Sequence, residues 1–152
     1  MALSKADEFW ADFIKNTGRS ENDRCAGDID FESHGIKNDA QVAMILAGKK
    51  TAFFSTLASY NIDGEPVPVT GELFLLFDRG NNPRAVLELE NVIVLPFNEV
   101  PWSLAKLEGE DESLEVWRER QQEYLEDEAQ VVGFNFTPDI KLVCQVFSVV
   151  YR

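Results

Sequence analysis

Two apolar segments joined by a short polar turn constrain the fold of this chain more than any other feature. Residues 73–77 form a continuous apolar run of the kind found in buried strands. The next segment, 78–83, reads DRGNNP and predicts a turn, because glycine, asparagine and proline favour turn conformations. Residues 84–95 then read as a returning strand with two distinct faces. The sequence therefore predicts an antiparallel hairpin over 73–95.

Other strands and helices can be placed around this hairpin. Helical periodicity and end signals predict helices over 4–18, 38–48 and 102–107, and a longer helix from about residue 111. Residues 51–58 read as a strand. Residues 140–151 are apolar on both faces, which predicts a central or barrel strand. The polar or proline- and glycine-rich segments 18–39 and 59–71 are interpreted as loops.

The order of these elements favours a fold class. Two helices come first and mostly strands follow, with helices inserted between them, which favours α+β with a small, mostly antiparallel sheet or barrel and helices packed outside. The 152 residues fit one domain, and 45% hydrophobic residues are enough for a packed core. We find no repeat and no linker, so we expect a single domain over 1–152.

Charge and composition exclude several classes of function. The formal net charge of −13 argues against broad binding to duplex DNA, which needs a basic face, although a small local basic site remains compatible with it. Cys25 and Cys144 are far apart and lack a CxxC spacing, so we expect free thiols in a reducing cytoplasm. No segment approaches the ~20 apolar residues of a membrane span. We expect a soluble, cytoplasmic protein that needs no membrane, metal or cofactor.

The adjacent lysines Lys49 and Lys50, in the segment GKKTAFFST, are the first candidate for chemistry. Neighbouring ammonium groups repel each other, and a lysine that is partly buried can act as a base or nucleophile near neutral pH. The alternative is that both lysines simply complement the dipole at the end of the preceding helix. The residues alone leave both interpretations open.

The acidic segment 108–112, EGEDE, is the second candidate. Most of its carboxylates fit the acidic N-terminus of a helix or a solvated face. Glu108 follows the apolar pair Leu104–Ala105 and is the residue most suited to turn inward as a general base or ligand clamp. His34 is the only histidine, and we expect it in an exposed loop. Aromatic side chains that could stack a base, although their spacing also fits a core, are Phe53, Phe54, Tyr60, Trp102 and Trp117.

Several spaced motifs together resemble one family. They are LAGKKTA at 46–52, PVTGELF at 68–74, LPFNEV at 95–100, LAKLEGEDESLEVWR at 104–118 and CQVFSVVY at 144–151. This set resembles the ASCH domain, whose fold is a small PUA-like β-barrel. The best match covers 46–151, residues 25–45 match more loosely, and 1–24 would form an N-terminal helix and the start of a long loop.

The resemblance implies a cleft near the GKKT segment that binds RNA, a nucleotide or a modified nucleoside. Small bacterial members of this family hydrolyse the amide of N4-acetylcytidine, and a ribonuclease activity is ascribed to some larger ones. In the amidohydrolases a lysine activates a threonine three residues later, assisted by a glutamate. Here the lysine corresponds to Lys50 and the glutamate to Glu108, but the threonine corresponds to Phe53, which has no hydroxyl.

The missing hydroxyl leaves three hypotheses. An enzyme would use Lys50 and Glu108 on a water molecule, because Thr51 and Ser55 lie roughly 7 Å along the strand from the family position. A binding module would hold its ligand without turnover, and Phe53 favours this hypothesis. A structural or partner-binding domain would use neither residue. Under the first two, the expected ligand contacts are Lys49, Thr51, Phe53, Ser55, Trp117 and Arg118. The substrate and the oligomeric state are left open.

Overall fold

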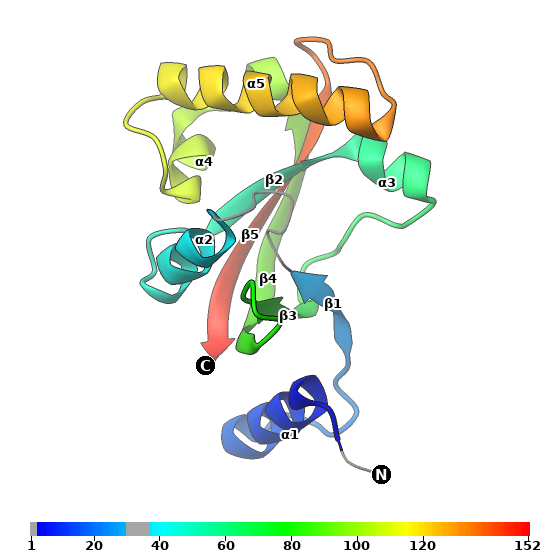
Figure 1. Cartoon of the computed structure of the whole chain (residues 1–152), viewed down its shortest axis with the longest axis vertical. Helices are drawn as coiled ribbons and strands as arrows, with labels where there is room; N and C mark the ends of the chain where they lie inside the picture. Colours follow the sequence, from blue (N-terminus) through cyan, green and yellow to red (C-terminus); the bar gives the residue numbers. More distant parts are fainter. Residues whose placement is uncertain (1–2, 30–36) are drawn as a thin grey trace. The chain divides into compact units, whose positions relative to one another are not determined.

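The computed structural model describes residues 3–29 and 37–152, with the side chains of Lys37 and Asn38 left out (Figure 1). His34, which is expected in an exposed loop, lies outside the described residues. The helices are α1 (Lys5–Thr17), α2 (Lys37–Leu46), α3 (Leu57–Asp63), α4 (Trp102–Ala105) and α5 (Leu114–Val132), with 3-10 turns η2 (Phe97–Glu99) and η3 (Lys106–Glu108). The strands are β1 (Cys25–Ile29), β2 (Ala52–Thr56), β3 (Leu73–Phe77), β4 (Pro83–Pro96) and β5 (Lys141–Tyr151).

The strands are hydrogen-bonded in the order β1-β3-β4-β5-β2. Strands β3 and β4 form the predicted antiparallel hairpin, in which Leu75 pairs with Val86. Strand β2 pairs antiparallel with β5, whereas β1 runs parallel to β3. The predicted α+β class with a largely antiparallel sheet is confirmed, and so is the internal position of β5. Within the described residues the strand order has two ends, at β1 and β2, so the sheet is not closed into the expected barrel there.

The chain divides into two compact units, of which the first contains residues 1–48, 70–90 and 147–152. Its core joins the apolar face of α1 to the β3–β4 hairpin. The buried residues of this core are Phe13, Leu73, Leu75, Phe77 and Val86. Helix α1 begins as predicted, because Ser4 and Asp7 form a capping box, and it ends at Gly18 in the left-handed conformation.

The second unit contains residues 49–69 and 91–146. Its core gathers around Trp117 of α5, which is fully buried. The Trp117 ring packs against Phe54 of β2 at 5.1 Å and against Phe97 at 5.8 Å between ring centroids. Burying an indole in this way supplies much of the hydrophobic stabilisation of a small core. Because both β2 and α5 contribute to this core, they are held in fixed positions within the unit.

Four of the expected boundaries are wrong, including the end of the strand predicted over 51–58, which stops at Thr56 because α3 begins at Leu57. The segment 18–39 is not one loop, since it contains β1, whose pairing with β3 could not be recognised from its polar residues. The segment 59–71 is not all loop, because Thr56 caps α3, which runs to Asp63. The long helix begins at Leu114 rather than near 111, because the Ser113 hydroxyl accepts from Val116 N–H and caps it there.

Among the described residues, none of the helices has the length and apolar character needed to cross a membrane. The expectation of one domain over 1–152 stays a prediction.

Candidate functional site

The backbone around Lys50 and Glu108 holds these two residues next to each other. The Thr51 N–H donates to the carbonyl oxygen of Leu107 at 2.8 Å, which ties the start of β2 to η3. Gly109 then ends η3 in the left-handed conformation, with φ of 76°. A side chain at this position would strain the backbone, so glycine is well suited to it. Lys50 precedes Thr51 and Glu108 follows Leu107, so the hydrogen bond between Thr51 and Leu107 holds these two residues close together.

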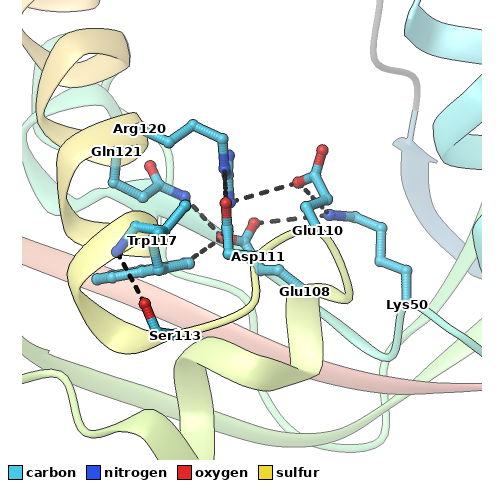
Figure 2. A network of polar contacts seen from close by, with 9 residues as sticks. Lys50, Glu108, Glu110, Asp111, Ser113, Trp117, Arg120 and Gln121 are labelled. Carbon is cyan, nitrogen blue, oxygen red and sulfur yellow. Dashed lines mark hydrogen bonds and ion pairs between the residues drawn. The ribbon is translucent and has the colours of Figure 1, made fainter.

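Glu108 is the centre of a buried polar network (Figure 2). Its Oε1 accepts three hydrogen bonds, from Trp117 Nε1 at 2.7 Å, Gln121 Nε2 at 2.6 Å and Arg120 at 3.1 Å. All three donors lie on α5, where spacings of three and four residues place side chains on one helix face. The Glu108 carboxylate is therefore fixed in orientation, and its Oε2 is the oxygen directed at Lys50.

Lys50 lies between two carboxylates. Its Nζ is 3.5 Å from Glu108 Oε2 and 3.5 Å from Glu110 Oε2, and its side chain is only 2% exposed. Removing a charged group from water costs several kcal/mol unless it is paired, and these contacts provide the pairing. The ammonium group is thus held as part of a cluster and not as a surface charge.

Arg120 closes the other side of the cluster. Its guanidinium bonds to both oxygens of Asp111 at 2.8 to 3.0 Å and also reaches Glu108 and Glu110. Burial by itself would lower the pKa of Arg120, but the hydrogen bond to Asp111 and the three nearby negative charges outweigh it and raise the pKa. The guanidinium therefore remains a permanent cation in this cluster.

Cys144 of β5 is affected by the same cluster. Burial and the negative charge of Glu108 raise the pKa of its thiol to about 12, since both disfavour the thiolate. A thiol in this state is a poor nucleophile at neutral pH. Cys144 is therefore a core residue, and the described part of the chain gives it no catalytic geometry.

The predicted ligand contacts fall in different places. Trp117 and Arg118 are engaged within the protein: Trp117 is buried against Glu108, and Arg118 donates to the carbonyl oxygens of Asn98 and Val100. Lys49 is exposed, whereas Thr51 is partly buried beside the η3 tie. The structure brings Lys50 together with Glu108, and it does not bring Arg118 into their network.

Phe53 and Ser55, the remaining predicted contacts, share one face of β2, because alternate strand residues point the same way. Both are partly buried. Ser55 Oγ lies 3.1 Å from the Tyr60 hydroxyl, and Gln145 Nε2 donates to that hydroxyl at 3.0 Å. A second hydroxyl, that of Thr56, is fully buried at the start of α3 and contacts Ser59 Oγ at 2.6 Å. These hydroxyls are thus engaged away from Lys50.

Sequence reasoning missed several members of the network. Gln121 was recognisable as a polar residue in an apolar stripe, and it is indeed only 4% exposed. Asp111 and Arg120 carried no such signal, because an acidic residue before a helix and an arginine within it are ordinary surface features. Within the described residues, no group of histidine, cysteine and acidic side chains has an arrangement suited to a metal ion.

Comparison with known proteins identifies the family. The family model of the ASCH domain matches residues 28–151, and this chain therefore belongs to the ASCH domain family. The match begins earlier than the motifs at 46–151, because it includes the end of β1 and all of α2. No curated protein matches the chain.

Two solved structures are similar over nearly the whole chain. One is the ASCH domain from Lactobacillus crispatus JV V101, with 26% identity, a TM-score of 0.88, and coverage of 97% of this chain and 95% of that one. The other is a protein from Enterococcus faecalis V583, with 27% identity, a TM-score of 0.85, and coverage of 99% and 90%. The fold of this chain is therefore that of the ASCH domain.

Proposed function

We propose that this ASCH domain binds a nucleoside, either free or as an unpaired residue of RNA, beside the Lys50–Glu108 pair. The observation that carries the proposal is the buried Lys50 ammonium, 3.5 Å from a Glu108 carboxylate that three donors on α5 fix in place. Buried ion pairs contribute little to stability compared with apolar residues of the same size. A fixed donor and acceptor side by side are suited to orienting a polar ligand.

The charge of the cluster favours an uncharged part of the ligand. The two cations Lys50 and Arg120 are paired with three carboxylates, those of Glu108, Glu110 and Asp111. The formal sum is 2 − 3 = −1, within a chain of net charge −13. A phosphate approaching this cluster would be repelled, whereas a base or ribose would not. We therefore expect the base or sugar, and not the phosphate, to contact it.

The hydroxyls near β2 favour binding over threonine-dependent hydrolysis. Phe53 stands where the amidohydrolases of this family carry threonine. The Ser55 and Thr56 hydroxyls are bonded to other groups, to Tyr60 and to Ser59 respectively. Neither contacts Glu108, whose hydrogen bonds come from α5. A nucleophile needs its activating base within hydrogen-bond reach, so these contacts support a binding module.

Calorimetric titration with cytidine, N4-acetylcytidine, cytidine monophosphate and a short single-stranded RNA tests the proposal. We expect binding of the nucleosides at least as tight as that of the monophosphate. Lys50→Met should weaken binding about tenfold or more, because it removes one charged contact. Lys141→Met is the matched control, since it removes the same charge at an exposed position of the same unit. Failure of all four ligands to bind, or equal losses in both variants, would contradict the proposal.

A second candidate function is amide hydrolysis through a water molecule, favoured by the 3.5 Å separation of Lys50 Nζ and Glu108 Oε2. Water would add across the amide of N4-acetylcytidine and release cytidine and acetate. Chromatography of the reaction with wild type, Lys50→Ala and Phe53→Thr distinguishes the candidates. Turnover by wild type that is lost in Lys50→Ala supports hydrolysis through water. Turnover by Phe53→Thr alone supports a binding module that has lost the hydroxyl.

A further inference from the structure

A neutral polar cluster on the second unit has no role in the Lys50–Glu108 network. It consists of Ser55 of β2, Tyr60 of α3 and Gln145 of β5. Gln145 Nε2 donates to Tyr60 OH at 3.0 Å and to Ser55 Oγ at 3.5 Å, and the two hydroxyls are 3.1 Å apart. Each of the three side chains therefore contacts the other two.

Phe53 lies on the same face of the sheet as this cluster. In the β2–β5 ladder Phe53 is directly opposite Gln145, and Ser55 is opposite Val143. Directly opposed residues of antiparallel strands direct their side chains to the same face, and so do residues two apart in one strand. Phe53, Ser55 and Tyr60 each keep some exposure, whereas Gln145 is only 3% exposed. A buried amide thus lies on the same face as an aromatic ring and a hydroxyl of two residues that are only partly buried.

The hydrogen bonds of the cluster are incomplete. A glutamine amide has two N–H donors and one acceptor oxygen, and each hydroxyl has one hydrogen to donate. The three distances place the two hydroxyl oxygens in nearly the same direction from Nε2, so they share one of its two diverging N–H groups, and the contact between Ser55 and Tyr60 uses one hydroxyl hydrogen. Within the described residues, the other hydroxyl hydrogen has no acceptor and Gln145 Oε1 has no donor. The cluster therefore presents one unpaired acceptor and at least one unpaired donor.

A nucleobase edge has the complementary groups. Cytosine, for example, carries an amino N–H donor and acceptor atoms along one edge, and unpaired bases are recognised by hydrogen bonds to such edges together with stacking on aromatic rings. Gln145 Oε1 requires a donor, and the free hydroxyl hydrogen requires an acceptor. Water can fill these positions in the free protein, and a base would replace it with fixed partners.

We propose that Ser55, Tyr60 and Gln145 form a base-recognition site that binds a nucleobase edge carrying an N–H donor and an acceptor, with the ring against Phe53. This inference rests on the proposed function and adds the residues that select the base. Tyr60 and Gln145 are the specificity-determining residues, since Gln145 accepts from the base and the Ser55–Tyr60 pair donates to it. Lys50 and Glu108 would contact another part of the same nucleoside.

The test compares cytidine with pyrimidin-2-one riboside, which is cytidine without the amino group. Calorimetry with wild type should show about tenfold tighter binding of cytidine, because the analogue leaves Gln145 Oε1 without a donor. Gln145→Leu should bind both compounds within about twofold of each other, since the acceptor is gone. Gln130→Leu, which makes the same change on the exposed face of α5, should keep the wild-type ratio. Tyr60→Phe provides a second variant and should weaken cytidine binding about threefold while keeping the ratio.

The outcomes separate this inference from the proposed function. Cytidine binding by wild type with an unchanged ratio in Gln145→Leu overturns the base-recognition site and leaves the proposed function standing. Equal binding of both compounds by wild type also overturns the base-recognition site and leaves the proposed function standing. Failure of wild type to bind either compound, or any of the ligands in the first titration, overturns the proposed function itself. A preference for cytidine over the analogue that is lost in Gln145→Leu but kept in Gln130→Leu and Tyr60→Phe supports the inference.

Discussion

The second unit contains two polar clusters that are built in opposite ways. The Glu108 cluster is charged and closed, because Lys50 and Arg120 are paired with carboxylates and Glu108 Oε1 accepts three hydrogen bonds. The Ser55–Tyr60–Gln145 cluster is neutral and open, since it retains one unpaired acceptor and at least one unpaired donor among the described residues.

The difference follows from the cost of burial. An unpaired charge out of water costs several kcal/mol, so a buried charged cluster must satisfy itself within the protein. An unpaired neutral group that water can reach costs much less and can remain available for a ligand. The charged cluster is thus held in place by its own contacts, and the neutral cluster keeps groups that a ligand could pair. Substitutions in the charged cluster should lower the stability of the protein strongly. Substitutions in the neutral cluster should cost little stability but should weaken ligand binding.

The largest effect is expected from Glu108→Ala. This change removes one of the two carboxylates that lie 3.5 Å from Lys50 and takes the acceptor away from Trp117 and Gln121. We expect the free energy of unfolding to fall by about 3–5 kcal/mol, as measured by urea denaturation. Glu112→Ala removes the same charge at an exposed position and should cost under about 0.5 kcal/mol. Similar losses in both variants would show that the charged cluster is not closed.

Trp117→Phe should have the next largest effect. It keeps an aromatic ring in the core but removes the indole N–H that donates to Glu108 at 2.7 Å. We expect a loss of about 2 kcal/mol, from the bond to a charged group and a small cavity. Trp102→Phe is the control, because Trp102 packs against the same core while the donors to Glu108 lie on α5. A smaller loss in Trp117→Phe than in Trp102→Phe would argue against a structural role for the hydrogen bond.

The pH dependence of stability tests the influence of Glu108 on Cys144. Burial, with the charge of Glu108, raises the pKa of the Cys144 thiol from 9.0 to about 12. Above pH 9 the unfolded chain therefore loses this proton before the folded protein does. The contribution of Cys144 is complete below pH 9 and is lost as the pH rises toward 12, by up to about 1.4 kcal/mol per pH unit.

Urea denaturation of wild type and Cys144→Ala between pH 8 and about 10.5 measures this contribution. The quantity compared is the slope of the free energy of unfolding against pH, and not the absolute stability of each protein. Wild type should lose stability more steeply than Cys144→Ala above pH 9. Parallel slopes would mean that the thiol titrates equally in the folded and unfolded states.

The smallest effect on stability is expected in the neutral cluster. Tyr60→Phe removes one hydroxyl that is partly exposed and bonded only to other neutral groups. We expect a loss of about 0.5–1 kcal/mol, several times smaller than that of Glu108→Ala. Thermal unfolding of the two variants side by side checks this ratio. A loss as large as that of Glu108→Ala would remove the distinction between an open and a closed cluster.

The sequence predicted elements whose signals are local. The capping box at Ser4, the hairpin over 73–95 and the apolar strand at the C-terminal end all depend on nearby residues, and each is present in the structure. The motifs from 46 to 151 also predicted the ASCH family, which the family model confirms over 28–151. Strand β1 was not predicted, because its five residues carry little apolar pattern and its partner β3 is far along the chain.

The candidate site shows the same division. The sequence by itself predicted that Lys50 and Glu108 were the residues to examine, and that Phe53 stands at the position of the family hydroxyl. Only the tertiary structure decided that both are buried within 3.5 Å of each other, that Arg120 and Asp111 belong to their network, and that Gln145 faces Phe53. The physical reason is that burial, hydrogen-bond partners and strand register depend on contacts between distant segments, which no local pattern records.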